Sequence, residues 1–199
     1  MIINYNNFLL EILKAVIKLC IAGLLIGLLK SHDLIIALIL LIKIIHVVYK
    51  NVIISKIKNW ILLYGMSLTG LAGMIGENWG VSNAYWEYHK VSRELPLWLP
   101  FAWMLAFYFL YSIESRLIPY LKYKTIKNKL IIAFWLSLLV PAFGEIITIN
   151  LGVWTYYWPY QVFGVPLYAF MCLVFVHMIV YGILAFICKK KKINDVVFT

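Results

Sequence analysis

Six apolar stretches, each close to the length that crosses a lipid bilayer, dominate this chain. A membrane-spanning helix needs about 20 mostly apolar residues, and the stretches predict spans at 8–29, 34–49, 60–78, 96–114, 130–150 and 165–188. Hydrophobic residues make up 64% of the 199 residues and charged residues 13%, whereas soluble domains are about half apolar and about a quarter charged. The sequence therefore predicts an all-α, multi-pass integral membrane protein. Span 34–49 is short, so its full crossing stays open.

Lysine and arginine are distributed unequally between the two sides of the predicted bundle. One side carries Lys50, Lys56, Lys58, Arg116, Lys122, Lys124, Lys127, Lys129 and Lys189–Lys192, and the other carries Lys30, Lys90 and Arg93. Cytoplasmic loops of membrane proteins are rich in these residues, which predicts that both termini are cytoplasmic, in a bacterial cytoplasmic (inner) membrane. The net charge of +10 is then explained by topology, and we expect no nucleic acid partner.

An internal repeat is predicted after residue 58. Shifting the chain by 68 residues aligns two Gly-Glu pairs and the Trp-x-Tyr motifs that follow them: Gly76-Glu77 with Gly144-Glu145, and Trp86-x-Tyr88 with Trp154-x-Tyr156. Each copy contains two spans, so both copies enter the membrane with the same polarity and form a parallel repeat. We divide the chain into an N-terminal helix pair at 1–58, copy A at 59–127, and copy B with the basic tail at 128–199.

Glu77 and Glu145 are the candidate catalytic residues. Small residues precede each glutamate at intervals of four and let helices approach closely, so both side chains are expected to face protein. Carboxyl groups inside a membrane are costly and usually face a cavity or a partner. A protonated one could act as a general acid. The alternative is that each glutamate bonds to a neighbouring loop and braces the end of its helix.

Aromatic rings crowd the same side of the bundle, and an aromatic belt at the membrane interface explains most of them. Rings beside a carboxylic acid can also stabilise a carbocation. The candidate substrate-binding residues are Trp86, Tyr88, Trp154, Tyr156, Trp98, Asn78, Asn150 and His177. A helix–helix hydrogen bond is the alternative role for His177. Histidines and cysteines show no ligand spacing, so we expect no metal and no cofactor.

These motifs resemble those of the bacterial and archaeal carotenoid biosynthesis proteins, which include membrane carotenoid 1,2-hydratases. The resemblance covers roughly residues 65–185 and depends on the segments Gly76-Glu77-x2-Gly80-x5-Trp86-x-Tyr88 and Leu95-Pro96-Leu97-Trp98-x-Pro100-x2-Trp103. It implies acid-promoted addition of water to a terminal isoprenoid double bond, or a related isomerase or cyclase reaction. Family members are generally longer, and usually carry aspartate where this chain has Glu145.

Three functions follow from these patterns. The leading hypothesis is a membrane enzyme that protonates a polyisoprenoid or carotenoid-like alkene. A small proton-coupled transporter or channel would use the paired intramembrane glutamates differently. A membrane assembly or scaffolding subunit would need no chemistry at all. The expected partners are a membrane lipid or isoprenoid substrate, with a homo-oligomer or other membrane subunits left open.

Overall fold

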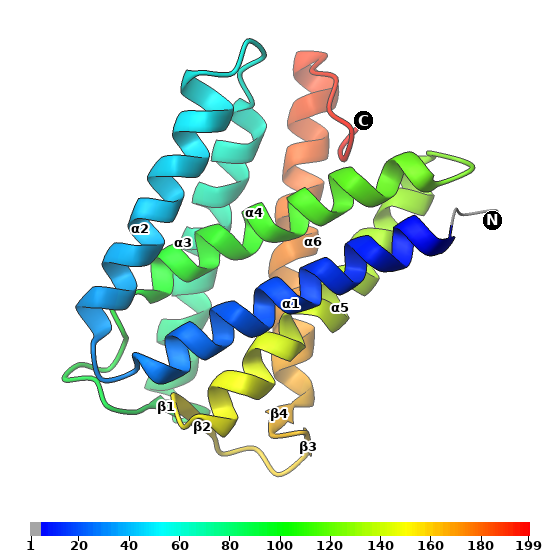
Figure 1. Cartoon of the computed structure of the whole chain (residues 1–199). Helices are drawn as coiled ribbons and strands as arrows, with labels where there is room; N and C mark the ends of the chain where they lie inside the picture. Colours follow the sequence, from blue (N-terminus) through cyan, green and yellow to red (C-terminus); the bar gives the residue numbers. More distant parts are fainter. Residues whose placement is uncertain (1–4) are drawn as a thin grey trace.

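The computed structural model describes residues 5–199, which fold mainly into six helices (Figure 1). The helices are α1 (Tyr5–Leu28), α2 (Asp33–Val48), α3 (Trp60–Ser82), α4 (Leu99–Leu117), α5 (Ile126–Asn150) and α6 (Leu167–Lys191). Two short helical segments, η1 (Tyr49–Ile53) and η2 (Ile118–Tyr120), extend α2 and α4. The all-α fold with six helices is confirmed. Residues 1–4 of the expected 1–58 helix pair lie outside the described part.

Three helical stretches within residues 5–199 are long and apolar enough to cross a membrane: Asp33–Ile53, Ile126–Asn150 and Leu167–Lys191. The first joins α2 to η1, which makes the short second span of the sequence prediction longer. Large apolar side chains also face outward on α1, including Leu9, Leu13 and Ile21. Water would solvate such an apolar surface poorly, whereas lipid would solvate it well. These features support a membrane protein.

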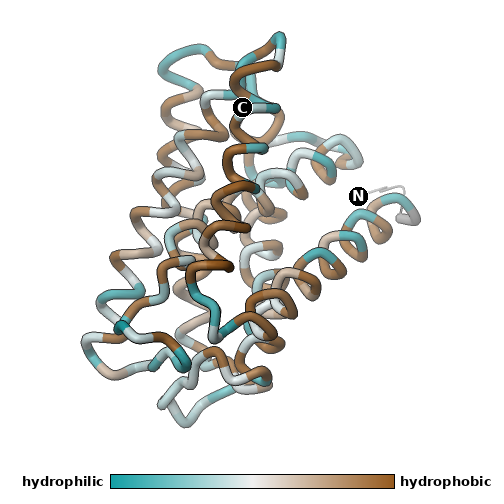
Figure 2. Tube along the Cα trace, turned by 60° about the vertical axis from the view of Figure 1, so that its left-hand side comes forward, coloured by the Kyte–Doolittle hydropathy of each residue, from teal (hydrophilic) through white to brown (hydrophobic). Residues whose placement is uncertain are grey.

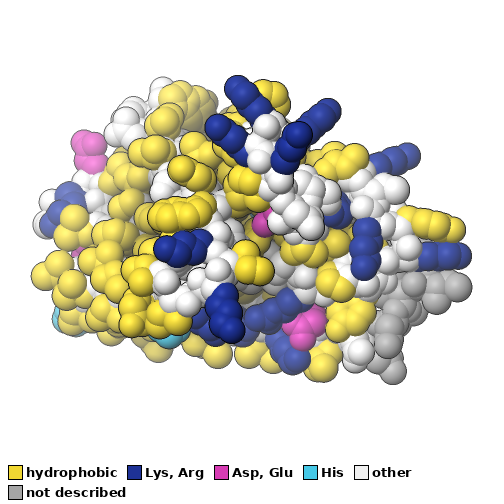
Figure 3. All heavy atoms as spheres, turned by 90° about the horizontal axis from the view of Figure 1, so that it is seen from above, with side chains coloured by type: hydrophobic (Ala, Val, Ile, Leu, Met, Phe, Trp, Pro, Cys, Tyr) yellow, Lys and Arg dark blue, Asp and Glu magenta, His cyan; other side chains and the backbone are white. Residues whose placement is uncertain are grey.

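The connections between helices gather at two opposite ends of the bundle (Figure 1). Segments 29–32, 83–98 and 151–166 lie at one end, and segments 54–59, 118–125 and 192–199 lie at the other. Hydrophilic residues concentrate in these connections, and hydrophobic residues follow the helices between them (Figure 2). Seen from above, the second end carries many Lys and Arg side chains and few acidic ones (Figure 3). We refer to it as the basic end.

Helices α3 and α5 end in the same way. Residues Ala84 and Gly152 both adopt left-handed backbone angles, with φ of 55° and 68°. In each case the following amide donates to the carbonyl five residues earlier, at 2.9 and 3.0 Å. This is the Schellman arrangement, which satisfies the free carbonyls at a helix end. A short strand follows each turn, β1 (Trp86–Tyr88) and β2 (Trp154–Tyr156).

Helices α4 and α5 begin away from the positions expected. Helix α4 starts at Leu99 instead of residue 96, because the preceding segment is held by a hydrogen bond from the Leu97 amide to Asp33 Oδ1, at 2.8 Å. Helix α5 starts at Ile126 instead of residue 130, since Thr125 caps it by accepting a bond from the Asn128 amide, at 3.4 Å. Thr125 is a polar capping group, which hydropathy does not register, whereas Trp98, the N-cap of α4, makes no side-chain cap bond.

Candidate functional site

A two-stranded antiparallel ribbon covers the end of the bundle opposite the basic end. Its strands β1 and β2 pair Trp86 with Tyr156 and Tyr88 with Trp154. Side chains alternate between the two faces of a strand, so these four rings share one face of the ribbon. The ribbon thus brings two segments 68 residues apart in the chain into contact, together with the four aromatic residues that the sequence nominated.

Glu77 lies beneath this ribbon and is 9% exposed. Its Oε2 accepts hydrogen bonds from Trp86 Nε1 at 3.0 Å and Tyr88 Oη at 2.8 Å. Its Oε1 accepts a third bond from Trp103 Nε1 at 3.1 Å. An indole N–H can only donate, so both oxygens of Glu77 are held as acceptors. The site therefore contains one carboxyl group whose orientation is fixed from three directions.

Two glycines of α3 make this arrangement fit. A Cβ atom at Gly80 would lie 1.8 Å from the Trp86 ring, and one at Gly73 would lie 2.2 Å from the Trp103 ring. Both indoles therefore rest directly on the helix backbone, on either side of the glutamate. By contrast, a Cβ atom at Gly76 would meet nothing within 4 Å. The glycines flanking Glu77 have different roles, and only Gly73 and Gly80 admit its hydrogen-bond donors.

Glu145 is held more loosely than Glu77. Among the described residues it accepts a side-chain hydrogen bond only from Tyr156 Oη, at 3.0 Å. The carboxyl group is half-buried in α5. Since one bond occupies one oxygen, the other oxygen keeps its capacity for a proton or a ligand. Of the two candidate acids, Glu145 is thus the one with an oxygen free to bind a proton or a ligand.

The two glutamates belong to one electrostatic site. Burial raises the pKa of Tyr88 well above its usual value, and the charges of Glu77 and Glu145 raise it further. Burial, followed by the same two charges, also raises the pKa of Tyr156 well above its usual value. Both hydroxyls therefore remain protonated near neutral pH and act as donors to the carboxyl groups.

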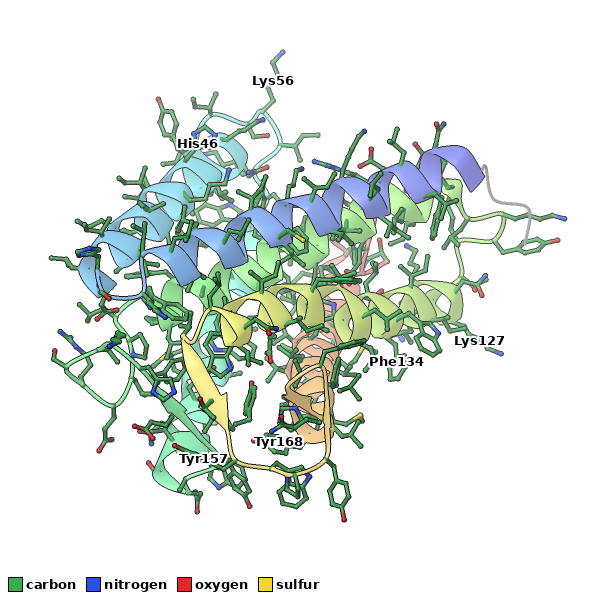
Figure 4. The ribbon with its side chains drawn as sticks, turned by 60° about the horizontal axis from the view of Figure 1, so that its bottom comes forward. His46, Lys56, Lys127, Phe134, Tyr157 and Tyr168 are labelled. Carbon is green, nitrogen blue, oxygen red and sulfur yellow. The ribbon has the colours of Figure 1, made fainter. Side chains whose placement is uncertain are left out.

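An aromatic cluster adjoins the two acids. Tyr168, in the first turn of α6, lies 6.2 Å from Trp86 and 6.0 Å from Tyr156 between ring centroids. Trp86 and Tyr156 are 5.7 Å apart, so the three rings contact one another. The Tyr168 hydroxyl donates to the Tyr85 carbonyl at 3.2 Å. Figure 4 shows Tyr168 and Tyr157 near each other, on the far side of the molecule from Lys56.

The remaining candidates among the aromatic residues take up supporting positions. Trp98 is buried and meets the Tyr88 ring edge-on, at 6.1 Å between centroids. Trp154 is also buried and lies 5.6 Å from Tyr88. Within the described part of the chain its Nε1 has no hydrogen-bond partner. A buried N–H of this kind is unusual and costs free energy, so Trp154 differs from Trp86, whose Nε1 reaches a glutamate.

The polar candidates lie outside this cluster. Asn78 is exposed, and the exposed Asn150 donates to the Ile146 carbonyl of its own helix at 2.7 Å. His177 lies nine residues further along α6 than Tyr168, roughly 13 Å at the 1.5 Å rise per residue of a helix. There its Nε2 is 2.7 Å from Glu114 Oε1, and both side chains are buried. The structure does not bring these three residues to the glutamates.

Three contributors went unrecognised at the sequence level: Trp103, Tyr168 and Glu114. Trp103 enters the sequence analysis only as the last residue of a family-like segment, and neither Tyr168 nor Glu114 is a sequence-based candidate. The signal for Trp103 was Gly73, a residue without a side chain one turn before Glu77 on the same helix face. For residues 5–199 there is no group of three His, Cys, Asp or Glu residues that could hold a metal ion. The chemistry available is that of two carboxyl groups and a set of rings, which attract positive charge.

Comparisons of the chain with protein-family models, with curated proteins and with solved structures gave no match. The function must therefore be argued from the geometry of the site.

Proposed function

We propose that the chain crosses a bacterial cytoplasmic membrane six times, with both termini on the cytoplasmic side. Consecutive connections alternate between the two ends of the bundle, as they must if every helix crosses. The basic end would face the cytoplasm, in keeping with the usual distribution of Lys and Arg. Helices α1, α3 and α4 would then cross beside the three more apolar ones.

We also propose that residues 59–127 and 128–199 are two copies of one helix pair. Equivalent contacts 68 to 70 residues apart support this. The rings of Tyr88 and Trp98 have centroids 6.1 Å apart and an interplanar angle of 84°. The rings of Tyr156 and Tyr168 have centroids 6.0 Å apart and an interplanar angle of 83°. The identical Schellman turns after α3 and α5 agree with it, and so does a ribbon in which each Trp lies opposite the other strand's Tyr. The pairing is that of two elements related by a twofold axis.

We infer from this site that the protein is a membrane enzyme acting on a polyisoprenoid or carotenoid-like alkene by protonation. The observation that carries the proposal is the pair of glutamates beneath one aromatic ribbon. A carboxylic acid can donate its proton to one alkene carbon: the O–H bond breaks, the π electrons form the new C–H bond, and the adjacent carbon becomes positive. The rings of Trp86, Tyr156 and Tyr168 would stabilise that cation.

The two glutamates have different roles in this mechanism. Glu145 keeps a free oxygen and is assigned as the proton donor. Glu77, held by three donors, stays an acceptor and supplies fixed negative charge to the cation. In a hydration, water adds to the cationic carbon and returns a proton to the Glu145 carboxylate. In an isomerisation, the carboxylate removes a proton from the neighbouring carbon.

The difference between the two acids follows from single residues of the proposed copies. Where copy A has Gly73 and Gly80, copy B has Pro141 and Thr148. The space that Gly80 leaves for an indole ring is therefore filled in copy B. This explains why Trp154 Nε1 has no partner among residues 5–199, and why the second carboxyl group lacks the indole donors that hold the first.

Mass spectrometry of lipids from an isoprenoid-producing host, with and without the protein, tests the proposal. We expect a product heavier by one water for a hydratase, or an isomer of unchanged mass for an isomerase or cyclase. Glu145→Gln should lower product formation by about 10²–10⁴-fold. Glu94→Gln, which alters an exposed carboxyl group on the loop before α4, serves as the control. Full activity in the folded Glu145→Gln variant would rule the mechanism out.

A second candidate is a proton-coupled transporter of organic cations. The buried Glu114–His177 pair between α4 and α6 favours it, because proton carriers place acids and histidines at successive depths. Uptake of a lipophilic cation into liposomes, driven by a proton gradient and lost in Glu145→Gln, would support this candidate. An unchanged lipid profile combined with such uptake would replace the enzyme by the transporter.

A further inference from the structure

The chain reverses direction after α6 and returns to the bundle at its basic end. Lys192 has a left-handed φ of 53°, and the Ile193 amide donates to the Cys188 carbonyl at 2.9 Å. This helix-ending turn directs residues 193–199 back along α6. In Figure 1 the segment lies beside the upper end of α6. We call residues 195–199 the return segment.

The return segment is buried at its apolar residues. Val197 is 0% and Phe198 3% exposed. The Phe198 ring lies 4.9 Å from that of Tyr181 and 5.9 Å from that of Tyr111, between centroids. Tyr181 projects from α6 and Tyr111 from α4. Phe198 therefore anchors the segment between α4 and α6.

Polar groups from three helices, α4, α5 and α6, contact the same segment, and Asn59 supports one of them. Tyr111 Oη donates to Asp195 Oδ2 at 2.8 Å, and Tyr181 Oη donates to the Val197 carbonyl at 2.7 Å. Asn59, the N-cap of α3, donates to Tyr111 Oη at 2.8 Å. Lys129 Nζ of α5 donates to the carbonyl groups of Val196, at 2.8 Å, and Thr199.

Hydrogen bonds within the return segment hold it in a turn that fits this position. Asp195 Oδ1 accepts hydrogen bonds from the amides of Val197 at 2.8 Å and Phe198 at 3.3 Å. One carboxylate oxygen thus fixes the turn while the other binds α4. Helices α4, α5 and α6 each contribute a donor, and the segment contributes the acceptors. Without it, buried donors of Tyr111, Tyr181 and Lys129 would lose their partners.

We propose that Asn59, Tyr111, Lys129 and Tyr181 form a peptide-binding socket. Its ligand is a short segment with an acidic residue three positions before an aromatic one, Asp-Val-Val-Phe-Thr, which the chain supplies itself. The contacts of the segment lie beyond the turn at Lys192 and are all non-covalent. The socket therefore accepts the same sequence from a separate peptide once the chain's own segment is released. This site lies at the opposite end of the bundle from the glutamates and is independent of the proposed reaction.

Cys188 provides a built-in reporter of socket occupancy. It is 0% exposed, and it lies on α6 one turn before the chain reverses. In a Cys20→Ser, Cys172→Ser background it is the sole thiol of the three in the sequence. We would measure its reaction with a small water-soluble maleimide in the full-length protein. Asp195→Ala and Phe198→Ala should each accelerate labelling by about tenfold or more, as the loss of a buried hydrogen bond or anchor predicts.

A peptide of residues 192–199 added in trans should restore protection of Cys188 in both variants, and the same peptide with Phe198→Ala should not. Val196→Ala, at a position 44% exposed, is the matched control and should label like the parent. Thermal unfolding in detergent distinguishes release of the segment from collapse of the fold. Two results overturn the proposal: Cys188 stays protected in both folded variants, or it becomes reactive and no excess of peptide protects it. If Phe198→Ala unfolds, labelling of Cys188 in Asp195→Ala and in Tyr111→Phe, with and without the added peptide, distinguishes the same outcomes.

Discussion

Gly80 lies directly beneath the indole ring of Trp86, so closely that a Cβ atom at this position would be 1.8 Å from Cη2 of the ring. Gly80→Ala must displace the ring and weaken its bond to Glu77. We expect a loss of about 1–3 kcal/mol, the usual cost of overpacking. Gly76→Ala, on the same helix and with nothing within 4 Å, should be neutral or stabilising by up to about 1 kcal/mol. Equal unfolding midpoints in detergent for the two variants would contradict this packing.

The two ribbon tryptophans should respond differently to loss of their N–H groups. Trp86→Phe removes a donor that binds Glu77 at 3.0 Å, whereas Trp154→Phe removes a buried N–H with no partner in the described part of the chain. Both substitutions shrink the ring by the same amount, so their difference isolates the hydrogen bond. We expect Trp86→Phe to cost about 1.5–3 kcal/mol more, as for bonds to charged groups. Denaturant unfolding of both variants measures the difference, and Trp154→Phe as the more damaging change would refute it.

The sequence predicted six helices because each lies on a long apolar stretch that hydropathy detects directly, and three of these stretches in residues 5–199 are long and apolar enough to cross a membrane. It also nominated Glu77, Glu145 and the Trp-x-Tyr motifs, since these recur at one fixed offset. It did not predict that the motifs pair as an antiparallel ribbon. That pairing depends on how two helix ends meet in space, and no pattern within either segment contains this information.

The hydrogen bonds of Glu77 show a second limit. Trp103 reaches it from another helix, 26 residues away, through space that Gly73 leaves open. Small residues at this spacing predict a helix-packing face, and the spacing does not reveal that a ring fills the gap. The sequence predicts the return segment only as the continuation of a basic tail. Its burial depends on Asp195 reaching Tyr111 of α4, 84 residues away in sequence, and on Phe198 packing against Tyr181 of the preceding helix α6.

The helix-ending turns offer a matched pair of substitutions. Ala84 and Gly152 occupy equivalent left-handed positions, with φ of 55° and 68°. A side chain costs about 1–2 kcal/mol there, and glycine does not. Ala84→Gly should therefore stabilise the protein by about 1 kcal/mol, and Gly152→Ala should destabilise it by a similar amount. Thermal unfolding in detergent gives both signs. Two shifts in the same direction would mean that neighbours, and not backbone strain, decide stability at these turns.

The buried residues Glu114 and His177 link α4 to α6, with Glu114 Oε1 2.7 Å from His177 Nε2. The second carboxyl oxygen of Glu114, Oε2, has no hydrogen-bond partner among the described residues. His177→Leu would leave the acid buried alone. We expect it to cost about 3–5 kcal/mol, as for removal of one partner from a buried pair.

Replacing both residues, Glu114→Leu with His177→Leu, removes the isolated acid together with its partner, so it should restore most of the stability lost in His177→Leu. A double-mutant cycle by chemical unfolding in detergent measures this coupling. If the pair only fastens the two helices, the double variant retains turnover. If the transporter proposal holds, the double variant folds normally but loses proton-driven uptake, because the acid that would carry the proton through the middle of the bundle is gone.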